Sequence, residues 1–394
     1  MMKRALLCLT LALVSLALVC LLVLGLSSAS VTHAGLAGRR SSPLPALGEG
    51  PEPDSRLRSR QAPGEVERMR AFGFFPGPAF PIYTGPHHQT DPAISGDVVV
   101  WVDEYADTYY TDTYYFDIYG CDLGTGQMFT VCAEGHEQHA PAIYGDIVVW
   151  ENYHDGLNGD IYGYDLSTGQ EFRVYTSTST QATPAIYGTI VVWEDYRGGS
   201  ADLYGIDLTT GQEFSVCTAT DYQIRPAIYG DVVVWQDRRS GTNYDIYGYD
   251  LSAGQEFTVC TEEHGQYKPA IYGDIVVWED LRNGTNYDIY GYDLSSRQEF
   301  TICTAARHQQ CPAIYGDVVV WQDKRSGGHF DIFGYDLSSG QEFPIYTGPY
   351  EQYQPAIYDR IVVWEDLRGE AGSDIYGARL YSHRVYLPLV IRSW

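Results

Sequence analysis

The chain has 394 residues, of which 44% are hydrophobic, so it contains enough apolar side chains for a sizeable core. Its formal net charge is −26, from 25 Lys and Arg against 51 Asp and Glu. Such an acidic chain repels phosphate groups, which excludes nucleic acid and anionic lipid as expected partners. Cations, proteins and neutral glycans stay open as partners.

Residues 1–34 have the order of a secretory signal peptide. Lys3 and Arg4 precede an apolar run from Ala5 to Leu26, and small residues then lead to Ala34. Cleavage near Ala34 is the first interpretation. An uncleaved N-terminal membrane anchor is the second, because the apolar run is just long enough to span a bilayer. In both cases we expect a secreted or extracytoplasmic protein. Residues 35–75, rich in Pro, Ser and Arg, show no period and are expected to be a disordered linker.

One sequence unit then occurs seven times. A segment of the type PAIYGDIVVWED begins at a proline, and successive copies are 42 to 49 residues apart. The prolines are Pro92, Pro141, Pro184, Pro226, Pro269, Pro312 and Pro355. Each copy carries one Trp in register: Trp101, Trp150, Trp193, Trp235, Trp278, Trp321 and Trp364. Self-similarity at this period indicates a repeat architecture.

Each unit reads as four short strands. In the unit from Pro226, the strand PAIY meets a turn at Gly230-Asp231 and is followed by the apolar strand VVVWQD and the polar loop RRSGTNY. The strand DIYGYDL, the turn SAGQ and the strand EFTVCT complete it. Four strands per unit of this length predict a β-propeller, in which neighbouring blades cover VVVW on both sides.

The ends of the array predict a closed ring. The array stops after a third strand, DIYGARL at 374–380, whereas AFPIYT at 79–84 resembles the fourth strand EFPIYT at 342–347. We expect residues 79–84 to complete the last blade, which leaves no open edge. The fold class is therefore all-β, a seven-bladed propeller over residues 76–380 with four antiparallel strands per blade. The apolar tail, residues 381–394, either docks on the last blade or acts as an export or sorting signal.

The unit resembles the TolB-like or WD40-like β-propeller repeat. The resemblance covers residues 79–380 and rests on the proline-led strand, the apolar strand, the loop Asp237-Arg238 to Gly241 and the strand that begins Asp245-Ile246-Tyr247. It implies a fold that mostly serves as an interaction platform and sometimes accompanies an enzyme. Seven units stand where TolB itself has six, so a TolB-type transport role is not implied.

The two faces of such a propeller differ in sequence. Turns between the first and second strands and between the third and fourth strands lie on one face and hardly change. Loops between the second and third strands and crossings between blades lie on the other face and vary, through either ligand binding or drift of solvent loops. The candidate binding residues on this variable face are His87, His88, His136, His139, His154, His264, His308, His329, Tyr109 and Tyr110.

One position in the crossings does not vary. A Gln stands three residues before every repeat proline, at Gln89, Gln138, Gln181, Gln223, Gln266, Gln309 and Gln352. We expect these seven amides to surround the mouth of the central channel. They either cap their strands and bond to the adjacent blade, or form a ring for water, a cation or a polar ligand.

The first unit has a longer loop, DEYADTYYTDTYYFD, between its second and third strands. Its acids Asp103, Glu104, Asp107 and Asp112 are either solvated or bind Ca²⁺, although their spacing does not fit an EF-hand. No other cofactor is expected. We interpret the repeated Trp as a core residue rather than as a platform for sugars. We interpret the recurrent D-x-R-x-G pattern as a salt-bridged turn rather than as a metal site.

The cysteines and the absence of catalytic motifs bear on the expected function. Cys132, Cys217, Cys260 and Cys303 share a fourth-strand position, and Cys303 with Cys311 is the one candidate disulfide. G-x-S-x-G, H-E-x-x-H and phosphate-binding glycine loops are absent. We therefore expect a monomeric, non-enzymatic propeller that binds a protein or a cell-surface polymer. Multivalent glycan binding is the alternative, and a polysaccharide hydrolase or lyase with its site at the channel mouth is the third interpretation.

Overall fold

The computed structural model describes residues 68–106, 114–154, 158–369 and 372–387, all within one compact unit. Every named element in these residues is a β-strand. Within them, no helix is long and apolar enough to cross a membrane. The expected signal peptide and linker residues 35–67 lie outside the described residues.

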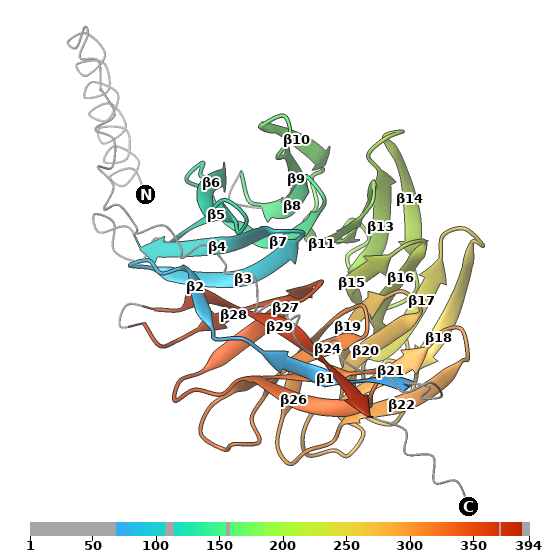
Figure 1. Ribbon diagram of the computed structural model, residues 1–394. Helices are drawn as coiled ribbons and strands as arrows, with labels where there is room; N and C mark the ends of the chain where they lie inside the picture. Colours follow the sequence, from blue (N-terminus) through green and yellow to red (C-terminus); the bar gives the residue numbers. More distant parts are fainter. Residues whose placement is uncertain (1–67, 107–113, 155–157, 370–371, 388–394) are drawn as a thin grey trace, which may run out of the picture. The chain divides into compact units, whose positions relative to one another are not determined.

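Seven antiparallel sheets surround a common axis and form the predicted seven-bladed propeller (Figure 1). The first strands of blades 1 to 7 are β3 (His88–Ser95), β7 (Gln138–Tyr144), β11 (Gln181–Tyr187), β15 (Gln223–Tyr229), β19 (Gln266–Tyr272), β23 (Gln309–Tyr315) and β27 (Gln352–Tyr358). The second strands are β4 (Val98–Ala106), β8 (Ile147–Asn152), β12 (Ile190–Asp195), β16 (Val232–Asp237), β20 (Ile275–Asp280), β24 (Val318–Asp323) and β28 (Ile361–Asp366).

The outer half of each blade follows the same order. The third strands are β5 (Tyr114–Asp122), β9 (Asp160–Asp165), β13 (Asp202–Asp207), β17 (Asp245–Asp250), β21 (Asp288–Asp293), β25 (Asp331–Asp336) and β29 (Asp374–Leu387). The fourth strands of blades 1 to 6 are β6 (Gln127–Cys132), β10 (Gln170–Tyr175), β14 (Gln212–Cys217), β18 (Gln255–Cys260), β22 (Gln298–Cys303) and β26 (Gln341–Tyr346).

The N-terminal strand β2 (Phe80–Tyr83) supplies the fourth strand of blade 7, as the sequence predicted. It pairs antiparallel with β29, with Phe80 opposite Gly377 and Tyr83 opposite Ile375. First strands of neighbouring blades contact one another around the ring, including β27 with β3. Because β2 lies just before blade 1 in the chain, this exchange joins the first and last blades.

A further strand, β1 (Arg68–Pro76), extends blade 7 beyond β2. It pairs with the second half of β29, from Pro76 opposite Leu380 to Arg68 opposite Leu387. Phe74 of β1 also packs against Phe343 of blade 6, with ring centroids 6.2 Å apart. The last residues of the segment expected to be a linker and the first part of the expected tail are therefore paired with each other.

The hydrophobic core lies between adjacent blades. Between blades 3 and 4, for example, Leu203 and Val216 pack against Val233 and Trp235. All seven tryptophans of the repeats are fully buried, which confirms that they are core residues and not an exposed sugar platform. Burial on both sides explains why the second strands lack a polar face.

A glycine in the middle of each third strand makes room for a ring from the fourth strand. A methyl group on Gly248 would lie 2.3 Å from the ring of Phe257, far inside van der Waals contact. The same Gly–Phe contact recurs in blades 1 to 6. The glycine of the DIYGYD strand is therefore required by packing.

Candidate functional site

A repeated ionic network on the variable face confirms the salt-bridged turn that the D-x-R-x-G pattern predicted. In blade 4, Trp235 Nε1 donates to Asp237 Oδ2 at 2.8 Å, and Arg239 donates to the same oxygen at 2.7 Å. Arg239 also pairs with Glu256 of β18 at 2.6 Å and lies over the ring of Tyr247. Blades 3 to 7 each contain the Trp–Asp–Arg part of this arginine network.

Each network also reaches the preceding blade. In blade 4, Arg239 Nη2 lies 3.1 Å from the Sγ atom of Cys217, which ends β14 of blade 3. In blades 3 and 7 a tyrosine takes the place of this cysteine, and the guanidinium lies over its ring. The fourth-strand cysteines are therefore buried inter-blade contacts, and all six described cysteines are free, Cys303 and Cys311 included.

Blades 1 and 2 lack the arginine network. The positions of Asp237 and Arg239 are occupied by Asp103 and Tyr105 in blade 1, and by Asn152 and His154 in blade 2. The indole nitrogens of Trp101 and Trp150 are buried without a partner among the described residues. Two neighbouring blades have thus replaced a structural ion pair with other chemistry.

Aromatic and imidazole side chains gather where the network is lost in blade 1. His87 Nδ1 lies 3.0 Å from Asp103 Oδ1, and its ring centroid lies 5.4 Å from that of Tyr105. Tyr105 in turn stacks on Tyr115 at 5.4 Å. Burial raises the pKa of Asp103, although the hydrogen bond from His87 opposes this shift.

The cluster continues into blade 2. His139 lies between Phe116, at a centroid distance of 4.5 Å, and Tyr153, at 5.8 Å. Its neighbour His136 makes an edge contact with His154 at 4.7 Å. We call these eight residues the aromatic sector: His87, Tyr105, Tyr115, Phe116, His136, His139, Tyr153 and His154.

The other predicted histidines do not join this cluster. His308 contacts Tyr287, and His329 lies 3.5 Å from Asp331, both on the side of blades 5 and 6. His88 and His264 are exposed. Tyr109 and Tyr110 lie outside the described residues, as do Asp107 and Asp112, so the predicted Ca²⁺ site of Asp103 and Glu104 with these acids stays a prediction.

The seven glutamines do not surround an open channel mouth, which corrects the expected placement. All seven are fully buried. In six of them the amide nitrogen donates to a carbonyl of its own crossing, for instance Gln138 to His136 at 2.6 Å and Gln352 to Tyr350 at 2.7 Å. Their backbone nitrogens bond to the loop of the preceding blade, as Gln223 does to Ala201. They therefore hold the crossings in shape.

The residue before each repeat proline, and not the glutamine, lies where we expected the glutamines, around the mouth of the central channel. Neighbouring members of this set touch across blades: Lys268 Nζ lies 3.0 Å from Cys311 Sγ, and Gln354 Nε2 donates to Asp91 at 2.7 Å. We call this set the inner ring: Asp91, Ala140, Thr183, Arg225, Lys268, Cys311 and Gln354. All seven have φ between 47° and 54°, in the left-handed region that residues other than glycine rarely adopt.

A tyrosine ring surrounds the axis toward the opposite face, where the sequence indicated only turns. Six tyrosines follow one another with centroids 4.5 to 4.6 Å apart: Tyr144, Tyr187, Tyr229, Tyr272, Tyr315 and Tyr358. In blade 1 the corresponding residue is Ser95, whose hydroxyl accepts from Gly145 N at 3.0 Å. The recurring Tyr of PAIY was the available signal for this ring.

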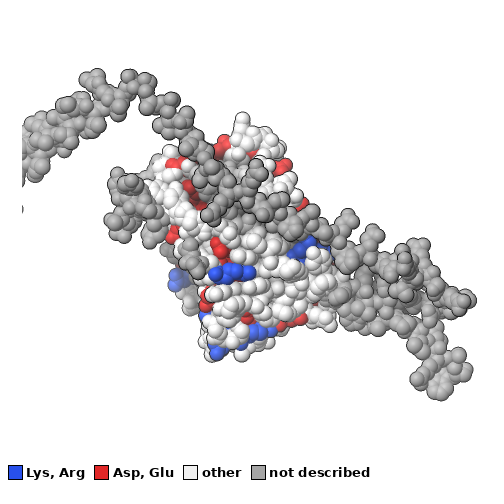
Figure 2. All heavy atoms as spheres, turned by 60° about the vertical axis from the view of Figure 1, so that its left-hand side comes forward, with Lys and Arg blue, Asp and Glu red and all other residues white. Residues whose placement is uncertain are grey.

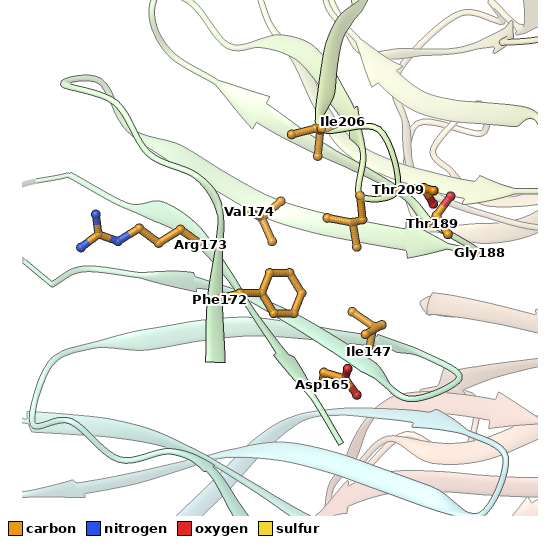
Figure 3. A pocket seen from close by; sticks show the side chains of 11 residues that line it. Ile147, Asp165, Phe172, Arg173, Val174, Gly188, Thr189, Ile206 and Thr209 are labelled. Atoms are coloured by element: carbon orange, nitrogen blue, oxygen red, sulfur yellow. The ribbon is translucent and has the colours of Figure 1, made fainter. Parts of the chain in front are cut away.

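The described surface also contains a shallow pocket between blades 2 and 3. It has a volume of ≈ 400 Å³ and is lined by Phe172, Val174, Ile206 and Leu208 with Thr189 and Thr209 at its edge (Figure 3). Of the residues that line it, only Asp165 and Arg173 carry a titratable group. On the side shown in Figure 2, charged side chains are scattered and most of the described surface is uncharged.

Comparison with known proteins places the chain by fold alone. No protein-family model and no curated protein matches it. The β-propeller domain of the Trilobed protease from Pyrococcus furiosus is 15% identical, with a TM-score of 0.60 over 76% of this chain and 97% of that one. An oligogalacturonate lyase in complex with manganese is 13% identical, with a TM-score of 0.58 over 80% and 97%. TolB from Acinetobacter baumannii is 18% identical, with a TM-score of 0.48, and the match spans 61% of this chain and 62% of TolB.

These neighbours overturn the expectation of a non-enzymatic protein. They include a complete lyase and the propeller domain of a protease, so membership in this fold does not argue against catalysis. The motif search was uninformative for a physical reason: successive units bring residues some 43 positions apart to the same face, and no short motif records such a site. The chain is thus a seven-bladed β-propeller whose fold is similar to that of the protease propeller domain and the lyase.

Proposed function

We propose that this propeller binds an extended polymer outside the cytoplasm and holds it on the aromatic sector of the variable face. The observation that supports the proposal is the replacement of the arginine network in blades 1 and 2. Five blades keep this network, and only the two that meet at the aromatic sector exchange it for imidazole and phenol groups.

The chemistry of the sector suits a polysaccharide strand. Stacked rings such as Tyr105 and Tyr115 offer flat apolar faces with a polar edge, the arrangement that amphipathic surfaces of sugar rings favour. The histidines add hydrogen-bonding groups whose orientation is held by carboxylates, as Asp103 holds His87. The acidic charge of the chain favours neutral over acidic polymers.

A polysaccharide array probed with the purified chain tests this proposal. Tyr105→Ala combined with Tyr153→Ala is expected to weaken binding at least about tenfold, as loss of buried aromatic anchors does at other interfaces. Tyr144→Ala is the matched control, because it removes an exposed tyrosine from the opposite face. Equal binding by both variants would contradict the proposed surface.

An acidic oligosaccharide cleaved at the axis is the second candidate. Arg225 and Lys268 stand in neighbouring positions of the inner ring, where Lys268 Nζ also lies 3.2 Å from Glu279 Oε1. A carboxylate-bearing sugar such as an oligogalacturonate would pair with them. Incubation with polygalacturonate should then release unsaturated products, detected by ultraviolet absorbance, and Arg225→Ala with Lys268→Ala should abolish that release. Absence of products would remove this candidate.

A further inference from the structure

Blade 2 retains the ligands of the arginine network after losing its cation. In blade 4 the guanidinium of Arg239 contacts Asp237, Glu256 and the Sγ atom of Cys217 from blade 3. The equivalent residues of blade 2 are Asn152, Glu171 and Cys132 of blade 1, in the same strand registers. His154 takes the position of the arginine.

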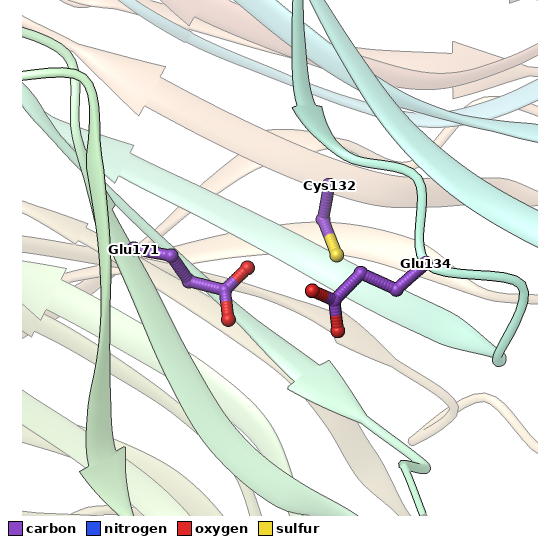
Figure 4. Close-up of side chains that lie close together, drawn as sticks. All are labelled: Cys132, Glu134 and Glu171. Carbon is purple, nitrogen blue, oxygen red and sulfur yellow. The ribbon is translucent and has the colours of Figure 1, made fainter. Parts of the chain in front are cut away.

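A second carboxylate joins the retained thiol and the retained carboxylate. Glu134, in the crossing between β6 and β7, turns toward Cys132 and Glu171 (Figure 4). The thiol and one oxygen of each carboxylate lie within 4.8 Å of one another. Cys132 is buried and the two carboxylates are exposed, so the group is open to solvent on one side.

Buried polar atoms beside this group lack partners. Asn152 is fully buried, and neither its Oδ1 nor its Nδ2 has a hydrogen-bond partner among the described residues. In blade 4, the corresponding side chain of Asp237 points at the guanidinium, so Asn152 is aimed at the place where blades 3 to 7 hold their cation. Unpaired buried polar groups are costly, which indicates a polar occupant.

In blade 1, both the arginine and the glutamate that pairs with it in other blades are replaced. Blade 1 has lost the arginine to Tyr105, and the position of the network glutamate is Met128 there. Loss of the cation was accompanied by loss of the carboxylate that paired with it. Blade 2 kept Glu171 and added Glu134, so two carboxylates lie together there without an arginine.

We propose that Cys132, Glu134 and Glu171 bind Zn²⁺, with the fourth coordination position on the side that is open to solvent. Zn²⁺ accepts sulfur, nitrogen and oxygen ligands in a tetrahedral arrangement, whereas Ca²⁺ and Mg²⁺ avoid thiolate. The ion takes the place of the guanidinium and joins the crossing of blade 1 to the fourth strand of blade 2. Binding removes the thiol proton of Cys132, which passes to solvent.

Titration of the untagged, chelator-treated chain with ZnCl₂, followed by calorimetry, tests the site. One high-affinity equivalent per chain is expected. Cys132→Ser and, separately, Glu134→Gln should weaken binding of this equivalent, the former by more than about 100-fold, the upper range for groups that merely support a ligand. Cys217→Ser is the matched control, because its sulfur has the same burial but faces Arg239. It should bind Zn²⁺ like the parent chain.

A variant of blade 2 that regains the residues of the other blades is expected to fold. Asn152→Asp with His154→Arg rebuilds the arginine network of blades 3 to 7, and should abolish Zn²⁺ binding while raising the melting temperature. With Co²⁺, the parent chain should show thiolate-to-cobalt charge-transfer absorption that Cys132→Ser lacks. Absence of a stoichiometric equivalent, or binding that survives either Cys132→Ser or the double substitution, would overturn the proposal.

Discussion

The seven tryptophans share full burial but differ at one atom, the indole nitrogen. Nε1 of Trp235 donates to Asp237, whereas Nε1 of Trp150 has no partner among the described residues. Trp235→Phe should therefore lower the free energy of unfolding by about 1 kcal/mol more than Trp150→Phe, the net value of one hydrogen bond. Urea denaturation of both variants measures this difference. Equal losses would show that the bond to Asp237 adds nothing.

Glu365 of blade 7 gives the protein a stability that depends on pH. Burial raises the pKa of this carboxyl from 4.5 to about 7, although the N–H of Asp91 donates to it and opposes the shift. The native state therefore holds a proton that the unfolded chain releases between these two values. The contribution of Glu365 to stability consequently falls as the pH rises from about 4.5 to 7.

The repeat itself offers a neutral replacement for Glu365. Gln236 and Gln322 occupy the same position in blades 4 and 6 and accept the same backbone bond, at 3.0 and 2.9 Å. Glu365→Gln should raise the free energy of unfolding by roughly 1–3 kcal/mol at pH 8 and by less at pH 5. Urea denaturation at both values is the measurement, and an equal gain at both would contradict the raised pKa.

Sequence reasoning at this scale placed the tryptophans in the core, whereas for the glutamines it left two roles open, of which bonding within the crossing and to the adjacent blade agrees with the contacts. A Trp after three apolar residues in mid-strand is buried on any arrangement of the sheet. The direction of a side chain near the start of the first strand depends on a bulge, where a left-handed residue such as Arg225 interrupts the alternation between Ile224 and Ala227. The repeat proline, such as Pro226, stands in that bulge and was the available signal for it, because proline within a strand is largely confined to edges and bulges.

Within blades 1 to 6, the third-strand glycine lies directly against the ring of the fourth-strand phenylalanine. Gly248→Ala should lower the free energy of unfolding by about 1–3 kcal/mol, since the added methyl group must displace the ring of Phe257. Gly328→Ala is the control, because a methyl group there meets nothing within 4 Å. Thermal melting of both variants gives the comparison. A similar melting temperature for the two would show that the ring moves aside at little cost.

Strand positions within a blade were predictable because β-branched runs alternate with turn residues in every unit. The pairing of β1 with the end of β29 was not, since neither segment carries a repeated pattern or a turn signal. A pairing between two segments more than 300 positions apart in the chain leaves no local periodicity to detect.

At the scale of the molecule, β2 determines whether the ring is closed. A chain that begins at residue 85 lacks β1 and β2 and leaves the edge of β29 unpaired in blade 7. It should melt at a lower temperature and self-associate, because an unpaired edge is a template for another strand. A chain that begins at residue 68 retains both strands and serves as the control.

Light scattering and calorimetry distinguish these outcomes. A monomeric shorter chain with an unchanged melting temperature would mean that closure by β2 contributes nothing to stability. The number of blades and the strand exchange could both be predicted from the sequence, because the repeated units can be aligned with one another. The ligand could not be predicted, because the aromatic sector is assembled from strand ends, crossings and loops of two blades.

Blade 1 interrupts the rotational symmetry of the ring at both ends of the axis. Ser95 replaces a tyrosine at one end, and Tyr105 replaces an arginine at the other. A ring of seven identical blades would offer a partner seven equivalent binding positions around the axis. Several copies of the partner could then bind to one chain. The marked sector removes this degeneracy, so a ligand that recognises it is held singly, in one orientation, and saturates at one copy per chain.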